Sequence, residues 1–125
     1  MADQQLSYGN FIDLLLQKVP ELRPLRDEHI RQYDELLPHV FFGELTRYVI
    51  DQVRAERDGT AQGGPEPVAR ILDFLERAMI SSDTKVQELV SVSFLENLDQ
   101  SDEAYAKLKA LLGPTLKREL ASYER

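Results

Sequence analysis

The sequence predicts an all-α protein, a compact bundle of about six or seven helices. Apolar residues recur at spacings of three and four along most of the chain, which is the period of one helix face. Prolines and capping residues divide these stretches into segments of ordinary helix length. No segment shows the apolar and polar alternation that is typical of a strand. Stacked helical pairs are an alternative, but the chain has no self-similar period, which favours the compact bundle.

The first half of the chain predicts three helices. Ser7 is a suitable N-cap for the first helix, and Pro20 ends it. The second helix is expected over residues 22–37, with Pro24 in its first turn, where proline is favoured. The third helix covers about residues 38–57, because its apolar residues share one face. The expected apolar contacts are Leu25, Ile30, Tyr33 and Leu36 in the second helix, and Phe41, Phe42, Leu45, Tyr48, Val49 and Val53 in the third.

Residues 58–64, with the sequence DGTAQGG, are the one clear break in the helical pattern. Glycines and polar residues dominate this segment, so we expect a flexible loop. The parts of the chain on either side are too short to be full domains. We therefore expect a single helical domain over residues 1–125 that contains this loop.

The second half predicts four more helices. The fourth begins near Pro65 and Pro67, and Asp83 caps a fifth over residues 84–98. Apolar residues surround most of the fifth helix, so we expect burial on several sides. The remaining signals are Ser101 as the cap of a sixth helix, Leu108, Leu111 and Leu112 inside it, Gly113 at its C′ position, and Pro114 at the start of a short seventh helix.

The charge and composition exclude several classes of protein. The 125 residues include 22 acidic and 15 basic ones, for a net charge of −7, and the pI is about 4.8. This charge disfavours nucleic acid and anionic membrane surfaces as partners. No apolar run approaches the roughly 18 residues that a membrane span needs. There is no cysteine and no signal-peptide pattern at the N-terminus, so we expect a cytoplasmic protein.

The sequence contains no motif for an active site, a cofactor or a metal. It lacks a phosphate-binding loop, a nucleophile elbow and a zinc-binding HExxH pair. Asp27, Glu28 and His29 are potential ligands, but consecutive helix residues point about 100° apart. We interpret these three as a solvated helix face. We therefore expect no catalytic residue, no cofactor and no metal, and we predict that the protein is not an enzyme.

Two places go beyond the pattern of an ordinary bundle, and the first is the start of the third helix. Gly43 lies inside this helix, where glycine costs about 1 kcal/mol relative to alanine, so we expect a close approach by another backbone or a ligand. A charged stripe lies opposite the apolar face. The stripe has a structural interpretation, as ordinary ion pairs beside a tight helix crossing, and a functional one, as a partner-binding surface in which Arg47 is the strongest contact. Its candidate partner-binding residues are His39, Glu44, Arg47 and Asp51.

The second place is the fifth helix and the acidic stretch that follows it. Asn97 shares the most apolar side of this helix, so we expect its side chain to be buried. It would then either satisfy loop backbone near the helix end or act as a recognition group in a pocket. The acidic stretch could dock on a basic protein, or the basic residues after position 104 could fold back and neutralise it. The candidate partner-binding residues here are Glu88, Glu96, Asn97 and Asp99.

Three segments of the chain resemble one known family. They are residues 36–47 (LLPHVFFGELTR), residues 92–98 (VSFLENL) and residues 112–116 (LGPTL), and residues 19–22 (VPEL) also fit. In this order they are similar to a family of small, acidic, all-helical bacterial proteins of uncharacterised function. The resemblance implies no activity. In size and charge its members are similar to immunity proteins, which neutralise bacterial toxins.

Three functional hypotheses follow. The first is a non-enzymatic protein-interaction module, such as an immunity-type inhibitor that covers a basic toxin domain. The second is a helical adaptor or regulatory subunit, or a homodimer, which an exposed apolar patch containing Phe42, Tyr48 or Tyr123 would favour. The third is a small-ligand sensor or enzyme that uses a pocket near His39 and Asn97, together with Arg47. We prefer the first, with another protein as the partner. The sequence does not predict an oligomeric state.

Overall fold

The computed structural model describes residues 7–57 and 66–124, and this part of the chain is all-α, as predicted. It contains no strand. Each expected helix is present. The predicted loop at 58–64 and the predicted helix start at Pro65 lie outside the described residues. The α-helices are α1 (Phe11–Lys18), α2 (Arg23–Tyr33), α3 (Pro38–Arg57), α4 (Glu66–Ile80), α5 (Thr84–Val90), α6 (Tyr105–Leu111) and α7 (Pro114–Ala121), with a 3₁₀ turn, η1 (Pro20–Leu22), and a π-helical segment, η2 (Ser91–Leu95).

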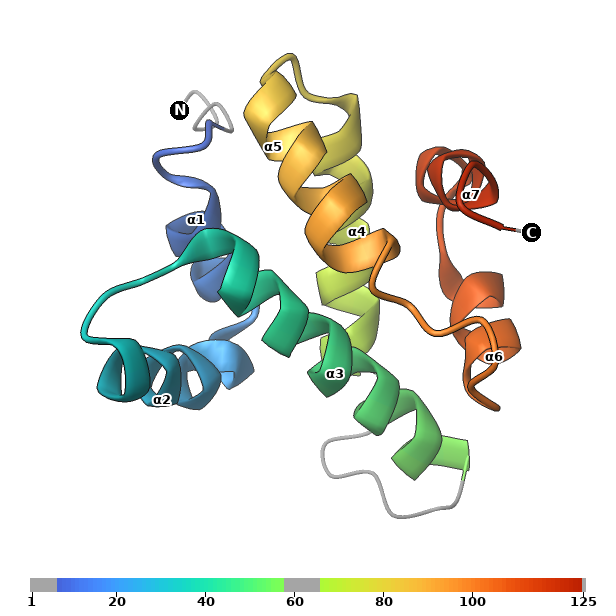
Figure 1. The fold of residues 1–125 in the computed structure, drawn as a ribbon, viewed down its shortest axis with the longest axis horizontal. Helices are drawn as coiled ribbons and strands as arrows, with labels where there is room; N and C mark the ends of the chain where they lie inside the picture. Colours follow the sequence, from blue (N-terminus) through green and yellow to red (C-terminus); the bar gives the residue numbers. More distant parts are fainter. Residues whose placement is uncertain (1–6, 58–65, 125) are drawn as a thin grey trace.

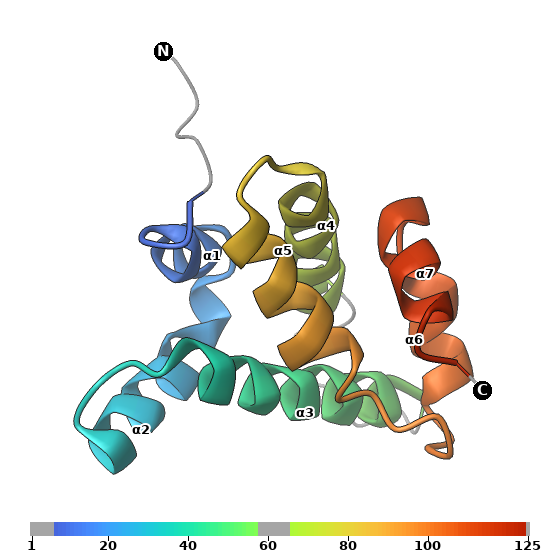
Figure 2. The same ribbon diagram turned by 45° about the horizontal axis from the view of Figure 1, so that its top comes forward.

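The longest helix, α3, runs diagonally across the view of Figure 1 and lies along the lower side of the molecule in Figure 2. It packs against α2, α4, α5, η2 and α6. Figure 2 shows α1 and α2 at one end of α3, and α6 and α7 at the other. Between them, α4 and α5 form an antiparallel pair. Because α3 touches most other elements, its surface borders both regions that the sequence analysis singled out.

The core is one cluster of apolar side chains, to which every α-helix except α2 contributes a fully buried residue. Aromatic rings from three helices meet at one end of this cluster. The Phe11 ring lies 5.5 Å from that of Phe42 and 5.2 Å from that of Phe74, measured between centroids. Such pairs add to the stability from area burial alone. The predicted apolar face of α3 is confirmed, since only Tyr48 on it is half-buried rather than buried.

The second predicted helix is shorter than expected and packs by a different face. It ends at Tyr33, because Asp34 adopts a left-handed conformation with φ of 63°, which ends helices. The expected contacts Ile30 and Tyr33 are both 38% exposed. The residue that faces α3 instead is His29, which is buried. The expectation of a solvated His29 was therefore wrong.

Helix caps also differ in part from the expected ones. Asp83 caps α5 as predicted, accepting from the backbone N–H groups of Lys85 and Val86. Ser7 is not a side-chain cap, because its own N–H donates to the side chain of Asn10. Ser101 does not cap α6 either, since that helix begins later, at Tyr105. In the sixth helix, Leu111 is 51% exposed, and Leu112 is buried in its place because the backbone becomes extended there.

The fifth predicted helix is interrupted by the π-helical segment η2. The backbone N–H of Glu96 donates to the carbonyl of Ser91 at 3.0 Å, five residues earlier. A π-turn holds one more residue than an α-turn, so it changes the direction in which the following side chains point. One expectation therefore fails, since Asn97 is exposed rather than buried. Val92, inside the π-segment, is 42% exposed.

Candidate functional site

The predicted partner-binding residues lie on two surfaces on either side of α3. Glu44, Arg47 and Asp51 line a groove between α2 and α3. His39 lies on the other side, where α3 packs against α5 and η2. The second surface, called the α3–η2 face here, consists of His39, Val40, Glu88, Val92, Glu96 and Asn97.

The α2–α3 groove is built around a buried histidine. Nδ1 of His29 lies 2.8 Å from Oε1 of Glu44. The backbone N–H of Leu37 donates to Nε2 of His29 at 2.9 Å. Both ring nitrogens are thus used inside the protein. Glu44, a predicted partner-binding residue, is held by this contact and its side chain is only 14% exposed, which makes it part of the fold rather than a free surface acid.

The groove itself has a volume of about 340 Å³ and a mixed charge. Arg47 is exposed and has no hydrogen-bond or ion-pair partner among the described residues. Asp51 lies 3.6 Å from Arg54, one helical turn further along α3. Of the three predicted residues in this groove, Arg47 alone is available for a strong new contact.

On the α3–η2 face, two predicted residues converge on Ser93. The side chains of His39 and Ser93 form a hydrogen bond between Nδ1 and Oγ. Nδ2 of Asn97 donates to the carbonyl oxygen of Ser93 at 2.8 Å. Asn97 therefore satisfies backbone near the helix end, which was one of the two interpretations of this residue. The nearest atom to a β-carbon at Gly43 would be Nδ2 of Asn97, at an ordinary 3.7 Å, so no other backbone approaches this glycine closely.

A buried threonine of α3, Thr46, lies between α3 and η2. Oγ1 of Thr46 donates to the carbonyl of Phe42 at 2.9 Å and lies 3.3 Å from the carbonyl of Phe94. Carbonyl groups in a π-segment lose their regular helical partners, and a nearby hydroxyl reduces the cost of burying them. Thr46 thus joins η2 to α3, and Asn97 supports η2 from within its own segment.

The outer part of the α3–η2 face combines apolar and acidic side chains. Val92 is 42% exposed and Val40 is 40% exposed. Glu88 lies four residues before Val92 and Glu96 four residues after it, and both are exposed. Neither has a hydrogen-bond or ion-pair partner among the described residues. A small groove of about 250 Å³ adjoins the face, lined by Tyr8, His39, Lys85 and Glu88.

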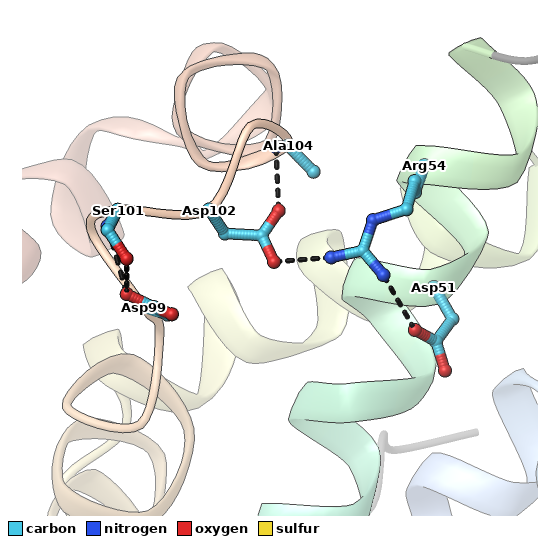
Figure 3. Close-up of polar contacts among 6 residues, drawn as sticks. All are labelled: Asp51, Arg54, Asp99, Ser101, Asp102 and Ala104. Atoms are coloured by element: carbon cyan, nitrogen blue, oxygen red, sulfur yellow. Dashed lines mark hydrogen bonds and ion pairs between the residues drawn. The ribbon is translucent and has the colours of Figure 1, made fainter.

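The acids beyond this face are engaged within the protein. Oδ1 of Asp99 accepts hydrogen bonds from the N–H and the hydroxyl of Ser101, and these bonds lower the pKa of Asp99. Asp102 binds Arg54 of α3 and accepts the N–H of Ala104 at 2.8 Å (Figure 3). Asp99 is thus bonded to its neighbour Ser101 but stays exposed, and the ion pair of Asp102 ties the loop before α6 to α3.

In the part of the chain that the structure describes, no basic residue after position 104 pairs with Glu88, Glu96 or Asp102. Among the ion pairs of residues 7–57 and 66–124, Lys109 pairs with Glu124 at 2.7 Å, inside the tail itself. Asp102 pairs with Arg54 instead. Glu88 and Glu96 keep their charge open to solvent.

Another carboxylate acts as a helix cap across the fold. Glu76 of α4 accepts the backbone N–H groups of Thr115 and Leu116, both at 2.9 Å, at the start of α7. Burial alone raises the pKa of Glu76, but these two N–H groups and the charge of Arg118 lower it on balance. Gly113 lies at the C′ position of α6, as predicted, because Leu112 is the C-cap residue. Its φ is −73°, however, rather than positive. Its lack of a side chain serves another purpose, which is to leave room for Glu76.

Sequence reasoning missed His29, Thr46 and Glu76. His29 and Glu76 bond to groups outside their own helices, and Thr46 bonds within α3 but also lies close to a carbonyl of η2. Spacing within one helix could not reveal these contacts between elements. The one available signal for His29 was its spacing of four from Leu25, which is half-buried and lies on the same side of α2.

The described residues contain no group of three or more side chains that could hold a metal ion. None of the helices in this part of the chain has the length and apolar character that crossing a membrane requires. A family model described as a domain of unknown function (DUF7674) matches residues 12–125. No curated protein and no solved structure matches the chain.

Proposed function

The chain belongs to the DUF7674 family, and we propose that it is a protein-interaction module without catalytic activity of its own. The observation that carries this proposal is the α3–η2 face. There, the exposed Val92 lies between two acids, Glu88 and Glu96, that have no partner within the described residues. An apolar centre with a polar rim is the arrangement found in protein–protein interfaces.

The face is also rigid, which favours binding. His39 and Asn97 are both held by Ser93, and Thr46 packs beneath them. Side chains that are already fixed lose little conformational entropy when a partner binds. Hydrogen-bonding groups of His39 and Asn97 beside an apolar centre could set the orientation of that partner.

The charge of the chain points to a basic partner. The net charge is −7, and two of the uncompensated acids lie on the proposed interface. Opposite charges raise association rates and disfavour wrong partners more than they raise affinity. We propose a cytoplasmic immunity-type inhibitor that covers a basic toxin domain. Its support is the acidity of the face and the similarity in size and charge to immunity proteins.

The alternative functions receive less support from the geometry. Phe42 is fully buried, and Tyr48 and Tyr123 are half-buried, so the three do not form an exposed apolar patch. A ligand pocket shared by His39, Asn97 and Arg47 is not favoured either. Arg47 lines the α2–α3 groove, and His39 lines a different one.

The test is site-specific photo-crosslinking in lysate of the native host. A photoreactive residue replaces Val92, and the matched control replaces Leu111, an apolar residue of α6 that is exposed to a similar degree. We expect one protein to crosslink at position 92 and not at position 111, and the same crosslink to be lost when the irradiation is carried out at high salt. Equal crosslinking at both positions, or none at position 92, would overturn the proposal.

Charge-reversed variants provide the quantitative arm. Glu88→Lys with Glu96→Lys should weaken binding of the captured protein at least about tenfold, mainly through slower association. Asp13→Lys with Asp27→Lys produces the same net charge on exposed parts of α1 and α2, and should change binding much less. If both double variants weaken binding equally, overall charge rather than the α3–η2 face determines binding.

A further inference from the structure

The most buried residue of helix α2 is polar. Of its eleven residues, only His29 is buried. Leu25 is half-buried against the core, and the apolar residues Ile30 and Tyr33 are each 38% exposed. Most helices in proteins are held by an apolar face. In α2, an imidazole ring that can change its charge lies at the centre of the contact with α3.

The hydrogen bonds of His29 define which nitrogen carries the proton. A backbone N–H can only donate, so Nε2, which receives the N–H of Leu37 at 2.9 Å, has its lone pair free. Nδ1 therefore carries the proton and donates to Oε1 of Glu44 at 2.8 Å. The ring is further enclosed by Tyr33 at 4.8 Å and Phe41 at 5.6 Å between centroids.

We propose that His29 is a proton-operated switch for the turn between α2 and α3. A proton on Nε2 places two N–H donors face to face, and the N–H of Leu37 loses its acceptor. The charged ring keeps its bond to Glu44, because a carboxylate binds a charged donor more strongly than a neutral one. The ring therefore stays in place, and the turn at Leu37 is the part that moves.

The movement has a direct route into α3. The carbonyl of Leu37 accepts the N–H of Phe41 at 2.8 Å, in the first turn of that helix. A rearranged Leu37 therefore alters the helix start that carries His39 and Val40. These two residues belong to the α3–η2 face, so the switch would change the edge of the proposed interface.

Several other charged groups lie near the ring. Among the charged side chains of residues 7–57 and 66–124, only that of Glu44 forms a hydrogen bond with it. In the turn itself, Asp34 and Glu35 are exposed. The titratable and charged side chains beside the ring are Glu28 and Tyr33 of α2, and Glu44, Arg47, Tyr48 and Asp51 of α3.

The switch is tested by NMR on the wild-type chain between about pH 8 and pH 5, the range over which histidine changes charge. The chain has two histidines, so His39→Gln identifies the ring signals of His29. We expect the Leu37 amide to be protected at high pH and to lose protection at least about tenfold, corrected for intrinsic exchange, as the His29 ring gains its proton. The Asp34 amide, bonded to the carbonyl of Ile30 at 2.7 Å, is the internal control and should stay protected.

Two results would overturn the switch. One is constant protection of Leu37 while the His29 ring titrates. The other is a His29 ring that stays neutral over the whole range. As a second arm, Glu44→Gln keeps an acceptor for Nδ1 but removes the charge that holds the protonated ring. In this variant we expect the ring of His29, and not only Leu37, to become mobile at low pH. None of these measurements needs a partner, so their outcome is separate from that of the proposed interface.

Discussion

The carboxylate of Glu76 occupies the space that a β-carbon at Gly113 would need. An added β-carbon would lie 2.6 Å from Cδ and 2.7 Å from Oε1 of Glu76. The same carboxylate caps the first turn of α7. Gly113, as the N-cap residue, has no side chain with which to cap that turn itself. The missing side chain of Gly113 thus leaves room for the carboxylate of Glu76, which caps α7 in its place.

Gly113→Ala should destabilise the protein by about 1–2 kcal/mol, because Glu76 must move away and leave two N–H groups without an acceptor. Chemical denaturation measures this loss. Glu76→Gln should cost a similar amount. The two effects should not add: in the Glu76→Ala background, Gly113→Ala should cost less than about 0.5 kcal/mol. Full additivity would show that the two residues are not coupled.

The contribution of Glu76 should depend on pH. Its pKa is lowered in the folded protein, so the stability it adds is present above the pKa of a free glutamate, about 4.3, and is lost as the pH falls through the folded pKa. The stability difference between wild type and Glu76→Gln should be complete at neutral pH and shrink below about pH 4.3. Denaturation at a series of pH values checks this. A difference that grew in acid would contradict it.

Gly43→Ala should have the opposite effect to Gly113→Ala. Gly43 lies inside α3 with φ in the usual helical range, and a β-carbon there would meet only Nδ2 of Asn97 at 3.7 Å. Alanine should therefore stabilise the protein by about 0.5–1 kcal/mol, the helix preference of alanine over glycine. Thermal denaturation measures the change. A loss of stability would mean that the crossing of α3 and η2 is tighter than the structure shows.

The two acids that bind Arg54 should differ in their value for stability. The side chain of Asp102 is 16% exposed and also accepts the N–H of Ala104, whereas that of Asp51 is 69% exposed (Figure 3). Asp102→Ala should cost about 1–2 kcal/mol. Asp51→Ala should cost less than about 0.5 kcal/mol, as is usual for exposed ion pairs. Urea denaturation of the two variants is the measurement, and equal losses would contradict the different roles.

Most of the fold could be predicted because its signals are local. Pro20, Pro38 and Pro114 mark helix boundaries correctly, and the apolar spacing in α3 identifies the face that is buried. Asp83 caps α5 through its own neighbours in sequence. Prolines, caps and apolar spacing act within one helix or turn, so a single sequence contains what is needed to see them.

The candidate site was predictable only in part, because its geometry depends on contacts between elements. His39 and Asn97 are candidates for different reasons in the sequence, and the structure brings both to Ser93. Glu44 is engaged by His29 of another helix, which no local pattern indicates, whereas Asp99 is engaged by Ser101, only two residues away. For Asn97, the error in predicted burial came from assuming a regular α-helix where the chain forms a π-turn.

That π-turn is a place where the chain can change in length without a change of fold. A π-turn holds one more residue than an α-turn, so loss of one residue from Ser91–Leu95 would restore a regular α-helix and leave the following side chains in nearly the same orientation. Leu98, which is 6% exposed and part of the core, would then stay buried. Loss of one residue from a regular α-helix such as α3 would instead rotate everything after it by about 100°, so we expect relatives that are one residue shorter to lack it at the π-turn.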